Sequence, residues 1–390
     1  MSKVVVIGAG ASGIIASLKA RENNEVILLD SNNKLGKKIL ITGNGKCNYF
    51  NTDININNYN TDSMDNLKSI LNNKDIVLEY LNDLGIYPKI KNGYYYPNSN
   101  QASSVVEVFN NNINKSNIKV IYECKVNDII KSDDSFIIKS NLDDIICDKV
   151  IIACGGCSYP KTGSDGSIFN IINKYHTVNS LLPSLVPLKL DFKYLKDWNN
   201  LRVDAKVELY INNNYVDSEI GEVQLTDYGI SGIPVFNLSG KIVKNVKENV
   251  ELKIDFLSDI SDLKSFLIDR NKDNRTIENI LETVLPYQLI DVLLRSINMD
   301  KNSYLDDNNV LLVVDGIKNF KVKVIDYLDF DRSQVTSGGV SLKEVNPNTL
   351  ESLKVKDLYL VGEVLDVDGK CGGFNLGFAF ISGYLAGKSV

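Results

Sequence analysis

Within its first thirty residues the chain carries a glycine pattern that few folds accept. An apolar, β-branched run at 3–7 leads directly into a Gly-X-Gly-X-X-Gly motif at 8–13, and a segment of helical composition follows over 14–22. A second apolar run, 26–29, ends in Asp30. Strand, glycine turn, helix, strand and acidic residue in this order are the fingerprint of a Rossmann-type unit that binds a dinucleotide. A glycine-rich turn without a ligand is the alternative interpretation.

The three glycines of this motif have separate predicted roles. Gly8 permits a tight turn, Gly10 lets the backbone approach a pyrophosphate, and Gly13 allows the helix to pack closely on the strand. The N–H groups at the start of the helix, near Ala11 and Ser12, are expected to bind phosphate together with the positive end of the helix dipole. The motif therefore predicts where the diphosphate of a dinucleotide would lie.

Asp30 and two later glycine motifs indicate which dinucleotide is bound. Asp30 is expected to accept hydrogen bonds from the adenosine ribose, which NAD and FAD share. Apolar runs at 149–153 and 358–361 also lead into glycines, at Gly155 and Gly362. Three such strands fit one parallel sheet with an extended ligand along its carboxyl edge, and FAD is the dinucleotide that needs all three. The predicted cofactor is therefore FAD.

A later glycine pair, Gly372 and Gly373, precedes a helix-like segment over 374–385. We expect the N-terminus of this helix near the pyrimidine end of the flavin, where its dipole would stabilise the negative charge that develops at N1 and O2 on reduction. The acidic loop 363–368 is expected near the ribityl chain. The alternative is that these glycines serve helix packing alone.

The composition excludes several classes of function. The 390 residues include 43 Lys and Arg against 49 Asp and Glu, a net charge of −6, so the sequence offers no basic surface for nucleic acid or for an anionic membrane. No apolar run approaches the roughly 18 residues of a membrane-spanning helix, and the segment 310–314 is predicted as a buried strand. We expect a cytoplasmic protein whose partner is a small molecule. The residues do not indicate its oligomeric state.

Side chains that usually carry acid–base or metal chemistry are scarce. The chain has one histidine, His176, expected at the surface or at a helix end, and no metal site is predicted. Six cysteines are too few and too scattered for a disulfide framework. Cys154 and Cys157 have a C-X-X-C spacing, so a flavin–disulfide relay stays open. Cys47 beside Lys46 is the thiol most readily activated, although packing near the cofactor is its favoured role. A bound cofactor would supply the chemistry that the side chains lack.

Five stretches of sequence, spread in order along the whole chain, carry a family resemblance. They are the first glycine motif, 35–48 (LGKKILITGNGKCN), 155–163, 225–232 (LTDYGISG) and the block from 335 to 387. This series resembles the BaiN-like and aminoacetone-oxidase-like FAD-binding flavoproteins. The resemblance implies a noncovalent FAD enzyme with a discontinuous nucleotide domain. Members are described as NAD(P)/FAD-dependent oxidoreductases, as proposed reducers of bile-acid enone intermediates, or as aminoacetone oxidases.

The resemblance also implies a set of cofactor contacts, carried over position by position. Three positions depart from the family: Lys46 stands where Arg is expected, Asp227 where His is common, and Cys371 where Thr is usual. Lys46 lacks the planar fork that Arg offers to phosphate, and Asp227 is expected to alter the charge of the substrate pocket. The implied contacts are Gly8, Gly10, Ala11, Ser12, Gly13 and Asp30 for the adenosine diphosphate; Lys37, Lys38, Gly43, Gly45, Lys46, Cys47 and Asn48 beside the pyrophosphate and flavin; and Gly155, Gly362, Glu363, Asp366, Gly372, Gly373, Phe374 and Asn375 along the ribityl chain and ring.

The predicted fold class is α/β, a glutathione-reductase-like Rossmann domain interrupted by a β-rich insertion domain and a small helical domain. The FAD-binding domain is predicted at 1–186 and 332–390, the β-rich domain at 187–257 and 318–331, and the helical domain at 258–317. Alternation of apolar and polar residues marks the strands, and a 3.6-residue period marks the helices. Strands are predicted at 188–192, 206–211, 215–225 and 318–326, helices at 276–285 and 289–297, and a mobile surface loop at 53–66.

Because the flavin would perform the chemistry, no side chain is assigned a catalytic role, and Cys47, Tyr159 and Tyr228 are only candidates. The leading hypothesis is hydride transfer through flavin N5, in which NAD(P)H reduces FAD and the flavin reduces a small or steroid-like enone. NAD(P)H would dock transiently, since no second strand-led glycine motif is visible. A flavin amine oxidase of aminoacetone-oxidase type and a non-catalytic flavin redox sensor are the alternatives.

Overall fold

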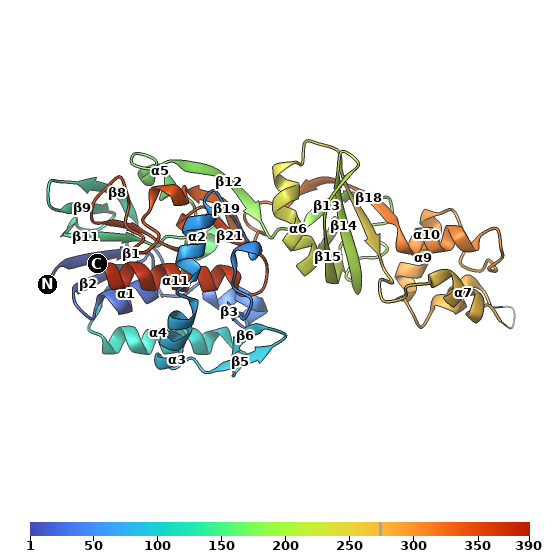
Figure 1. Ribbon diagram of the computed structural model, residues 1–390, viewed down its shortest axis with the longest axis horizontal. Coiled ribbons are helices and arrows are strands. Elements are labelled where there is room, and N and C mark those ends of the chain that lie inside the picture. The colour runs from blue at the N-terminus through green and yellow to red at the C-terminus, as the bar shows by residue number, and fades with distance from the viewer. Residues whose placement is uncertain (273–274) are drawn as a thin grey trace. The chain divides into compact units, whose positions relative to one another are not determined.

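The computed structural model describes residues 1–272 and 275–390, which form two compact units (Figure 1). The first, the nucleotide unit, comprises 1–183 and 333–390. The second, the barrel unit, comprises 184–332. The chain leaves the nucleotide unit once and returns to it, and the segments predicted as β-rich and as helical both lie in the barrel unit.

A five-stranded parallel sheet with the order β20-β11-β1-β2-β7 forms the centre of the nucleotide unit. Its strands are β1 (Lys3–Ile7), β2 (Glu25–Leu29), β7 (Lys119–Ile121), β11 (Lys149–Ile152) and β20 (Leu358–Leu360). The central strands are apolar and buried on both faces, as expected of a covered parallel sheet. Ile7 pairs with Ile152, and Ile152 with Leu360. The three glycine motifs that follow these strands therefore lie next to one another.

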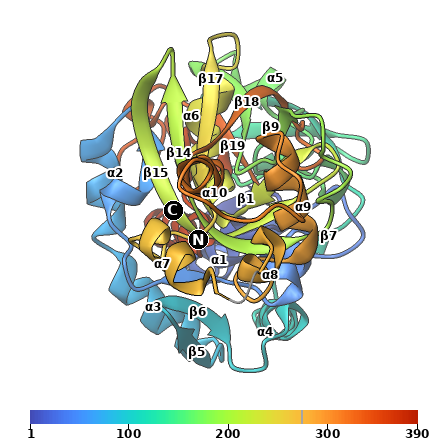
Figure 2. The same ribbon diagram turned by 90° about the vertical axis from the view of Figure 1, so that its right-hand side faces the viewer.

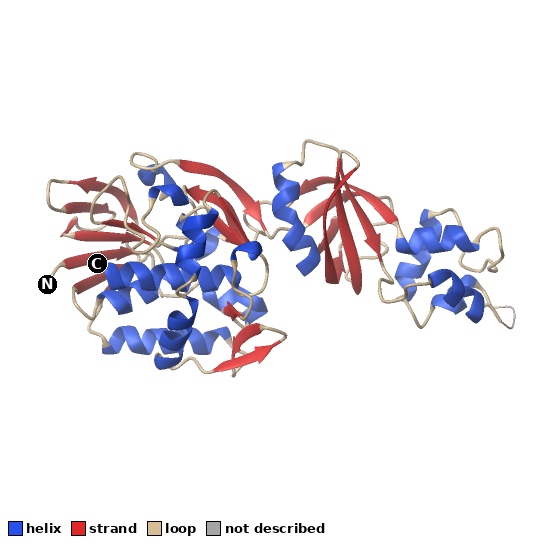
Figure 3. Cartoon of the chain, in the orientation of Figure 1, coloured by secondary structure: helices blue, strands red, loops and turns tan. Residues whose placement is uncertain are grey.

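Helices α1 (Ala11–Ala20) and α11 (Phe374–Ser389) lie side by side in this unit (Figures 1 and 3). They approach closely because α11 has glycine where it meets α1. A Cβ atom at Gly383 would lie 2.3 Å from the carbonyl oxygen of Ser12, and one at Gly387 would lie 2.4 Å from that of Ala16. The unit also contains α2 (Met64–Leu71), α3 (Lys74–Asp83), α4 (Ala102–Lys115) and α5 (Phe169–Ile172).

Smaller sheets and 3-10 turns complete the nucleotide unit. The sheets are β8 (Val126–Lys131), β9 (Phe136–Ser140) and β10 (Ile145–Cys147); β3 (Phe50–Asn51), β5 (Pro88–Lys91) and β6 (Tyr94–Pro97); β12 (Val178–Ser184) with β19 (Val335–Val340); and β4 (Tyr59–Thr61) with β21 (Val367–Gly369). The turns are η1 (Ile39–Gly45), η2 (Ile56–Asn58), η3 (Pro160–Thr162), η4 (Leu342–Glu344) and η5 (Gly362–Val364).

The prediction of a surface loop over 53–66 is wrong. This segment contains η2 and β4 and runs into the start of α2. Ile54 and Tyr59 are buried in the core, and the Tyr59 hydroxyl donates to the carbonyl oxygen of Phe374 at 2.9 Å. Two buried apolar side chains, hidden among asparagines in the sequence, anchor the segment to α11.

In the barrel unit, six antiparallel strands close into a barrel in the order β13-β16-β15-β14-β17-β18; Figure 2 shows β14, β15 and β17. Alternate residues along β14 and β17 are buried, in agreement with the predicted alternation. Asn212 and Asn213 have positive φ angles of 50° and 65°, which suit the short turn between β14 and β15. The strands are β13 (Leu188–Asp191), β14 (Arg202–Ile211), β15 (Asn214–Leu225), β16 (Gly229–Gly232), β17 (Val250–Asp255) and β18 (Phe320–Tyr327), and the helices described are α6 (Ile233–Lys244), α7 (Leu263–Arg270), α8 (Ile277–Leu281), α9 (Tyr287–Ser296) and α10 (Val310–Lys318).

The apolar run at 310–314 is helical, so the prediction of a buried strand is wrong. Val310, Val313 and Ile317 are buried on one face of α10, while Leu311 and Leu312 are exposed. A short apolar run fits a strand and a helix equally well, and periodicity alone does not separate them. Before the run, the Asp306 side chain accepts from the N–H groups of Asn308 and Asn309 in a turn that leads into the helix.

His176 follows α5 but is buried, which corrects the prediction of a surface position. Its side chain is fully buried, with Nδ1 3.0 Å from Glu344 Oε2 and Nε2 3.0 Å from Ser352 Oγ. Burial lowers the pKa of His176. The Glu344 carboxylate also accepts from Thr177 N at 3.0 Å and from Lys354 Nζ at 2.6 Å, and its hydrogen bonds hold its pKa at about 2 against the opposing effect of burial. The histidine is part of a buried polar network that joins two distant segments.

Candidate dinucleotide-binding site

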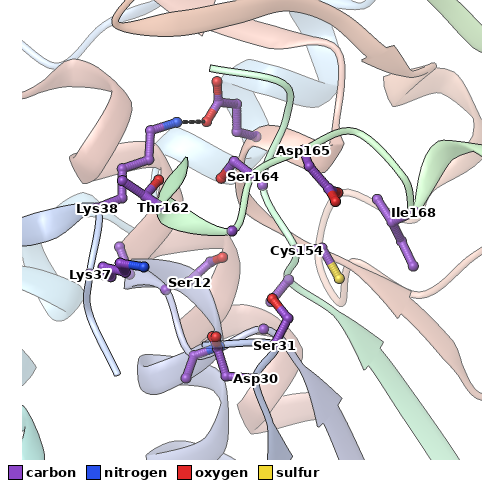
Figure 4. Close-up of a pocket in the computed structure, with 18 of the residues that line it drawn as sticks. Ser12, Asp30, Ser31, Lys37, Lys38, Cys154, Thr162, Ser164, Asp165 and Ile168 are labelled. Atoms are coloured by element: carbon purple, nitrogen blue, oxygen red, sulfur yellow. Dashed lines mark hydrogen bonds and ion pairs between the residues drawn. The ribbon is translucent and has the colours of Figure 1, made fainter. Parts of the chain in front are cut away.

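A cavity of about 390 Å³ lies inside the nucleotide unit. The turns that follow β1, β2 and β11 line it, at the edge of the sheet where parallel strands present their carboxyl ends. Figure 4 shows Ser12, Asp30 and Lys37 around this cavity, with Thr162 and Ser164 from another wall. Segments far apart in the sequence therefore build one pocket.

The glycines of the first motif differ in what surrounds them. A Cβ atom at Gly8, where φ is 106°, would lie 2.5 Å from the Ala153 carbonyl oxygen, and one at Gly13 would lie 1.8 Å from that of Gly8. These two positions must be glycine for the turn and the packing to form. A Cβ atom at Gly10, in contrast, would meet nothing within 4 Å, although Gly10 lines the cavity. Open space beside this backbone fits the close approach of a phosphate group.

The N-terminus of α1 points backbone N–H groups at the same space. Gly10 is the N-cap, no side chain caps the helix, and no acidic residue stands in its first turn. Ala11 and Ser12 line the cavity. Uncapped N–H groups and the positive end of the helix dipole form an anion site. The diphosphate of a dinucleotide fits this position.

Asp30 stands at the end of β2 and is held by backbone groups. Its Oδ2 atom accepts from Ala9 N at 2.6 Å, and its Oδ1 atom accepts from Asn32 N at 2.7 Å and from Asn32 Nδ2 at 2.9 Å. An ionised carboxylate has about four acceptor positions. One position therefore remains for a ribose hydroxyl group.

Lysines on two sides of the cavity are held by hydrogen bonds and ion pairs. Lys37 Nζ donates to Asn32 Oδ1 at 2.9 Å, and Lys38 Nζ lies 2.8 Å from Glu363 Oε2 (Figure 4). Glu363 Oε1 also accepts from Thr336 N at 2.6 Å.

Lys125 and Lys161 line the cavity as well, and sequence reasoning missed both, together with Asn32. Lys161 lies within the stretch 155–163 but was given no role there, and no motif marks Asn32 or Lys125.

About half of the predicted cofactor residues line the cavity. Those that line it are Gly8, Gly10, Ala11, Ser12, Asp30, Lys37, Lys38, Gly155, Glu363 and Asn375. Outside its lining lie Gly13, Gly43, Gly45, Lys46, Cys47, Asn48, Gly362, Asp366, Gly372, Gly373 and Phe374, as do the candidates Tyr159 and Tyr228. Cofactor roles for both groups stay predictions.

Several residues of the second group lie together at the N-terminus of α11. A Cβ atom at Gly373, the N-cap, would lie 2.3 Å from the Phe50 carbonyl oxygen and 2.8 Å from Asn48 Oδ1. Asn51 Nδ2 donates to the Gly372 carbonyl oxygen at 2.7 Å. The loop that contains Asn48 is therefore packed against the first turn of α11. As in α1, no side chain caps α11 and no acidic residue stands in its first turn.

The thiols are poorly suited to redox chemistry. In the part of the chain that the structure describes, the six cysteines carry thiols rather than disulfides. Burial raises the pKa of Cys47 to about 12, which disfavours the activated thiol that its neighbour Lys46 suggested and leaves packing as its expected role. Burial also raises the pKa of Cys154 to about 12, and its Sγ donates to the Ile7 carbonyl oxygen at 3.3 Å. The pKa of Cys157 is raised by burial and by the nearby Glu363 carboxylate. A thiolate, which a disulfide relay needs, is disfavoured at each position.

Metal and membrane sites have no counterpart in the described part of the chain. Across residues 1–272 and 275–390, no group of three or more His, Cys, Asp or Glu side chains is placed to hold a metal ion. Within the same ranges, no helix has both the length and the apolar character to span a membrane.

Comparisons with known proteins agree with the fold. The family model described as HI0933-like protein Rossmann domain matches residues 2–389. The 3-dehydro-bile acid delta(4,6)-reductase of Clostridium scindens is 35% identical, covering 100% of this chain and 99% of its own length. The ribosomal RNA dihydrouridine synthase of Escherichia coli is 27% identical, covering 99% and 97%.

Solved structures with little sequence identity share the fold. An open flavocytochrome c3 fumarate reductase matches with a TM-score of 0.52 at 13% identity, covering 100% of this chain and 78% of that one. The 3-ketosteroid-delta4-(5alpha)-dehydrogenase of Rhodococcus jostii RHA1 matches with a TM-score of 0.51 at 12% identity, covering 100% and 96%. The full-length family match, the Rossmann sheet and the dinucleotide cavity agree: the chain belongs to the HI0933-like, BaiN-type family of FAD-binding Rossmann proteins and is an FAD-dependent oxidoreductase.

Proposed function

We propose that this oxidoreductase reduces a carbon–carbon double bond conjugated to a carbonyl group in a small, steroid-like substrate. The observation that carries the proposal is the 35% identity to a 3-dehydro-bile acid delta(4,6)-reductase over the full length of both chains. Bound FAD supplies the chemistry, accepting and giving a hydride at N5. The side chains of this protein are then left to bind, orient and exclude water.

The residues that would hold the cofactor divide it into two halves. Gly10 and the start of α1 would bind the diphosphate, and Asp30 would accept from the adenosine ribose. The uncapped N-terminus of α11, with Gly373 as its N-cap, is the proposed neighbour of the pyrimidine end of the flavin. A positive dipole end in that place favours the reduced, negatively charged flavin.

We propose NAD(P)H as the electron donor, docking transiently rather than in a second nucleotide domain. The sequence has one strand-led Gly-X-Gly-X-X-Gly motif, at 8–13, and its cavity is assigned to FAD. A donor that leaves after reducing the flavin would vacate the space for the substrate. Cys47, Tyr159 and Tyr228 are given no catalytic role in this scheme.

A second candidate follows from the match to ribosomal RNA dihydrouridine synthases, which is also full length but only 27% identical. Reduction of a uracil ring in RNA is the same type of reaction, since that ring also has a double bond conjugated to a carbonyl group. RNA binding depends on positive charge that neutralises phosphates. The net charge of −6 disfavours such a substrate, so the small enone is preferred.

Anaerobic flavin spectroscopy tests the proposal. NADH or NADPH is expected to bleach the flavin absorbance of the holoenzyme, and a 3-keto-Δ4 or 3-keto-Δ4,6 steroid is then expected to restore it with formation of the saturated product. Reoxidation by a uridine-containing RNA but by no steroid would move the assignment to the second candidate. Bleaching by aminoacetone would indicate an amine oxidase, and a flavin inert to all of these would indicate a redox sensor.

A further inference from the structure

We propose that Asn32 is a positioning residue for the adenosine half of the cofactor, an inference that rests on FAD binding in the cavity described above. Its single amide group contacts three parts of the cavity wall. Asn32 Nδ2 donates to Asp30 Oδ1 and to the Thr162 carbonyl oxygen, both at 2.9 Å, and Asn32 Oδ1 accepts from Lys37 Nζ at 2.9 Å. Both hydrogens and the oxygen of the amide are thus used.

The two charged partners of Asn32 are residues that line the cavity. Asp30 is the acid at the end of β2, and Lys37 is the cation opposite it. A neutral amide donates to the acid and accepts from the cation at the same time, which neither a carboxylate nor an ammonium group can do. Asn32 therefore fixes the orientation of the Asp30 carboxylate and of the Lys37 ammonium group. It also keeps Lys37 from pairing directly with Asp30 Oδ1.

The third partner of Asn32 is a turn from the opposite wall. Residues 159–163 form a tight turn, in which Tyr159 has a φ of 53° and the Thr162 hydroxyl donates to the Tyr159 carbonyl oxygen at 2.8 Å. Gly163 packs directly on Asn32, since a Cβ atom there would lie 2.5 Å from Asn32 Nδ2. The hydrogen bond to the Thr162 carbonyl oxygen sets the position of this turn above the end of β2. Lys125 and Asp165 form a second link to the same wall, 3.2 Å apart, but it is exposed to solvent and therefore weak.

The backbone of Asn32 is itself fixed, so the amide acts from a rigid base. Its N–H donates to Asp30 Oδ1 at 2.7 Å, and its carbonyl oxygen accepts from Glu123 N at 3.0 Å. The Asp30 carbonyl oxygen accepts from Cys124 N at 2.9 Å. A change at the Asn32 side chain is therefore expected to move the 159–163 turn and Lys37 rather than the end of β2.

The nearly isosteric substitution Asn32→Asp removes two of the three contacts of the amide group and keeps the third. The new carboxylate keeps an acceptor for Lys37, but it has no donor for Asp30 or for the Thr162 carbonyl oxygen, and it repels the Asp30 carboxylate. Asn245→Asp is the matched control, because Asn245 Nδ2 donates to the Lys241 carbonyl oxygen at 2.8 Å at the exposed end of α6. Lys37→Met removes the third contact alone. Circular dichroism and thermal unfolding identify any variant that fails to fold.

Two measurements are made on each variant. Hydrogen exchange of residues 159–166 in the FAD-free protein reports the turn itself, and FAD titration followed by flavin fluorescence reports the cofactor. We expect Asn32→Asp to speed exchange of this segment and to raise the dissociation constant of FAD about tenfold or more, as the loss of two hydrogen bonds implies. Asn245→Asp should change neither.

Two results would overturn the inference. The first is a wild-type FAD affinity in Asn32→Asp, whatever the exchange rate, because the contacts would then serve the fold alone. The second is weak FAD binding with unchanged exchange, because Asn32 would then act without positioning the turn. Weak binding in Lys37→Met alongside the first result would show that Lys37 acts without the amide donors. A wild-type protein that binds no FAD would instead remove the proposed function, and the inference with it.

Discussion

Lys38 and Glu363 stand 325 positions apart in the sequence, yet their side chains form an ion pair of 2.8 Å in the cavity wall. The exposed fractions of the two side chains are 23% and 19%, so water screens the pair only partly. Glu363 also accepts from Thr336 N and so fixes a third segment. The pair ties the loop after the first glycine motif to the turn after β20.

Breaking this ion pair is expected to destabilise the FAD-free protein. Lys38→Met and Glu363→Gln should each lower the free energy of unfolding by about 1 to 2 kcal/mol, between the values for exposed and for buried pairs. Urea unfolding measures the change. The double variant should lose less than the sum of the two, and strict additivity would show that the pair contributes no coupling energy.

Alanine at Gly10 and at Gly13 should separate cofactor binding from folding. Gly10 has an extended φ of −83° and open space beside it, so Gly10→Ala should unfold at nearly the wild-type temperature but bind FAD at least about tenfold more weakly. Gly13→Ala places a Cβ atom 1.8 Å from the Gly8 carbonyl oxygen and should cost about 3 kcal/mol or more of stability. Thermal unfolding and flavin fluorescence check the two. Equal FAD binding by Gly10→Ala and the wild type would argue against a phosphate at this turn.

The buried His176 is expected to make stability depend on pH. Its pKa is lowered by burial from the usual value of 6.5, so below pH 6.5 the unfolded chain binds a proton that the folded protein does not. The free energy of unfolding should therefore fall as the pH drops through 6.5 and level off above it. Glu344, with a pKa near 2, adds a second loss between pH 4.5 and 2.

Nuclear magnetic resonance tests the first of these losses directly, because His176 is the only histidine in the sequence. Its titration midpoint in the folded protein should lie below 6.5, and His176→Gln should flatten the stability profile between pH 5 and 7. A midpoint above 6.5 would mean that the Glu344 carboxylate outweighs burial.

The thiols are expected to be slow to react and indifferent to the redox state of the flavin. With a pKa near 12, on the order of one Cys154 or Cys47 thiol in 10,000 is ionised at pH 8. A thiol reagent should therefore modify these residues slowly in the folded protein and all six in urea. The variant Cys154→Ser with Cys157→Ser should keep flavin reduction by NAD(P)H. Loss of reduction in a folded double variant would restore the disulfide relay.

The sequence was enough to predict those parts of the site that are formed by residues close together in the chain. The roles predicted for Gly8 and Gly13 agree with the structure because turn geometry and close packing act within one strand–turn–helix unit. The strands β14 and β15 were also predictable, because alternate residues are buried along β14 and, at the C-terminal end of β15, at Val223 and Leu225.

Contacts between distant segments decided the rest. His176 is buried because Glu344 and Ser352, more than 160 positions away, satisfy its ring nitrogens. Asn32 carries no motif, and its role depends on Thr162, which only the fold brings to it. The apolar run of α10 follows a turn that leads into the helix, and its own periodicity did not separate helix from strand.

The packing of α11 on α1 has a consequence for biosynthesis. Helix α1 leaves the ribosome long before the helix that covers it, α11, which packs with Gly383 on Ser12 and Gly387 on Ala16. Domains generally fold as units during synthesis. The barrel unit is therefore completed before α11 is translated. The apolar face of α1 stays uncovered until then, because α11 is translated more than 350 codons later. This side of the nucleotide unit is thus completed only once α11 has been translated.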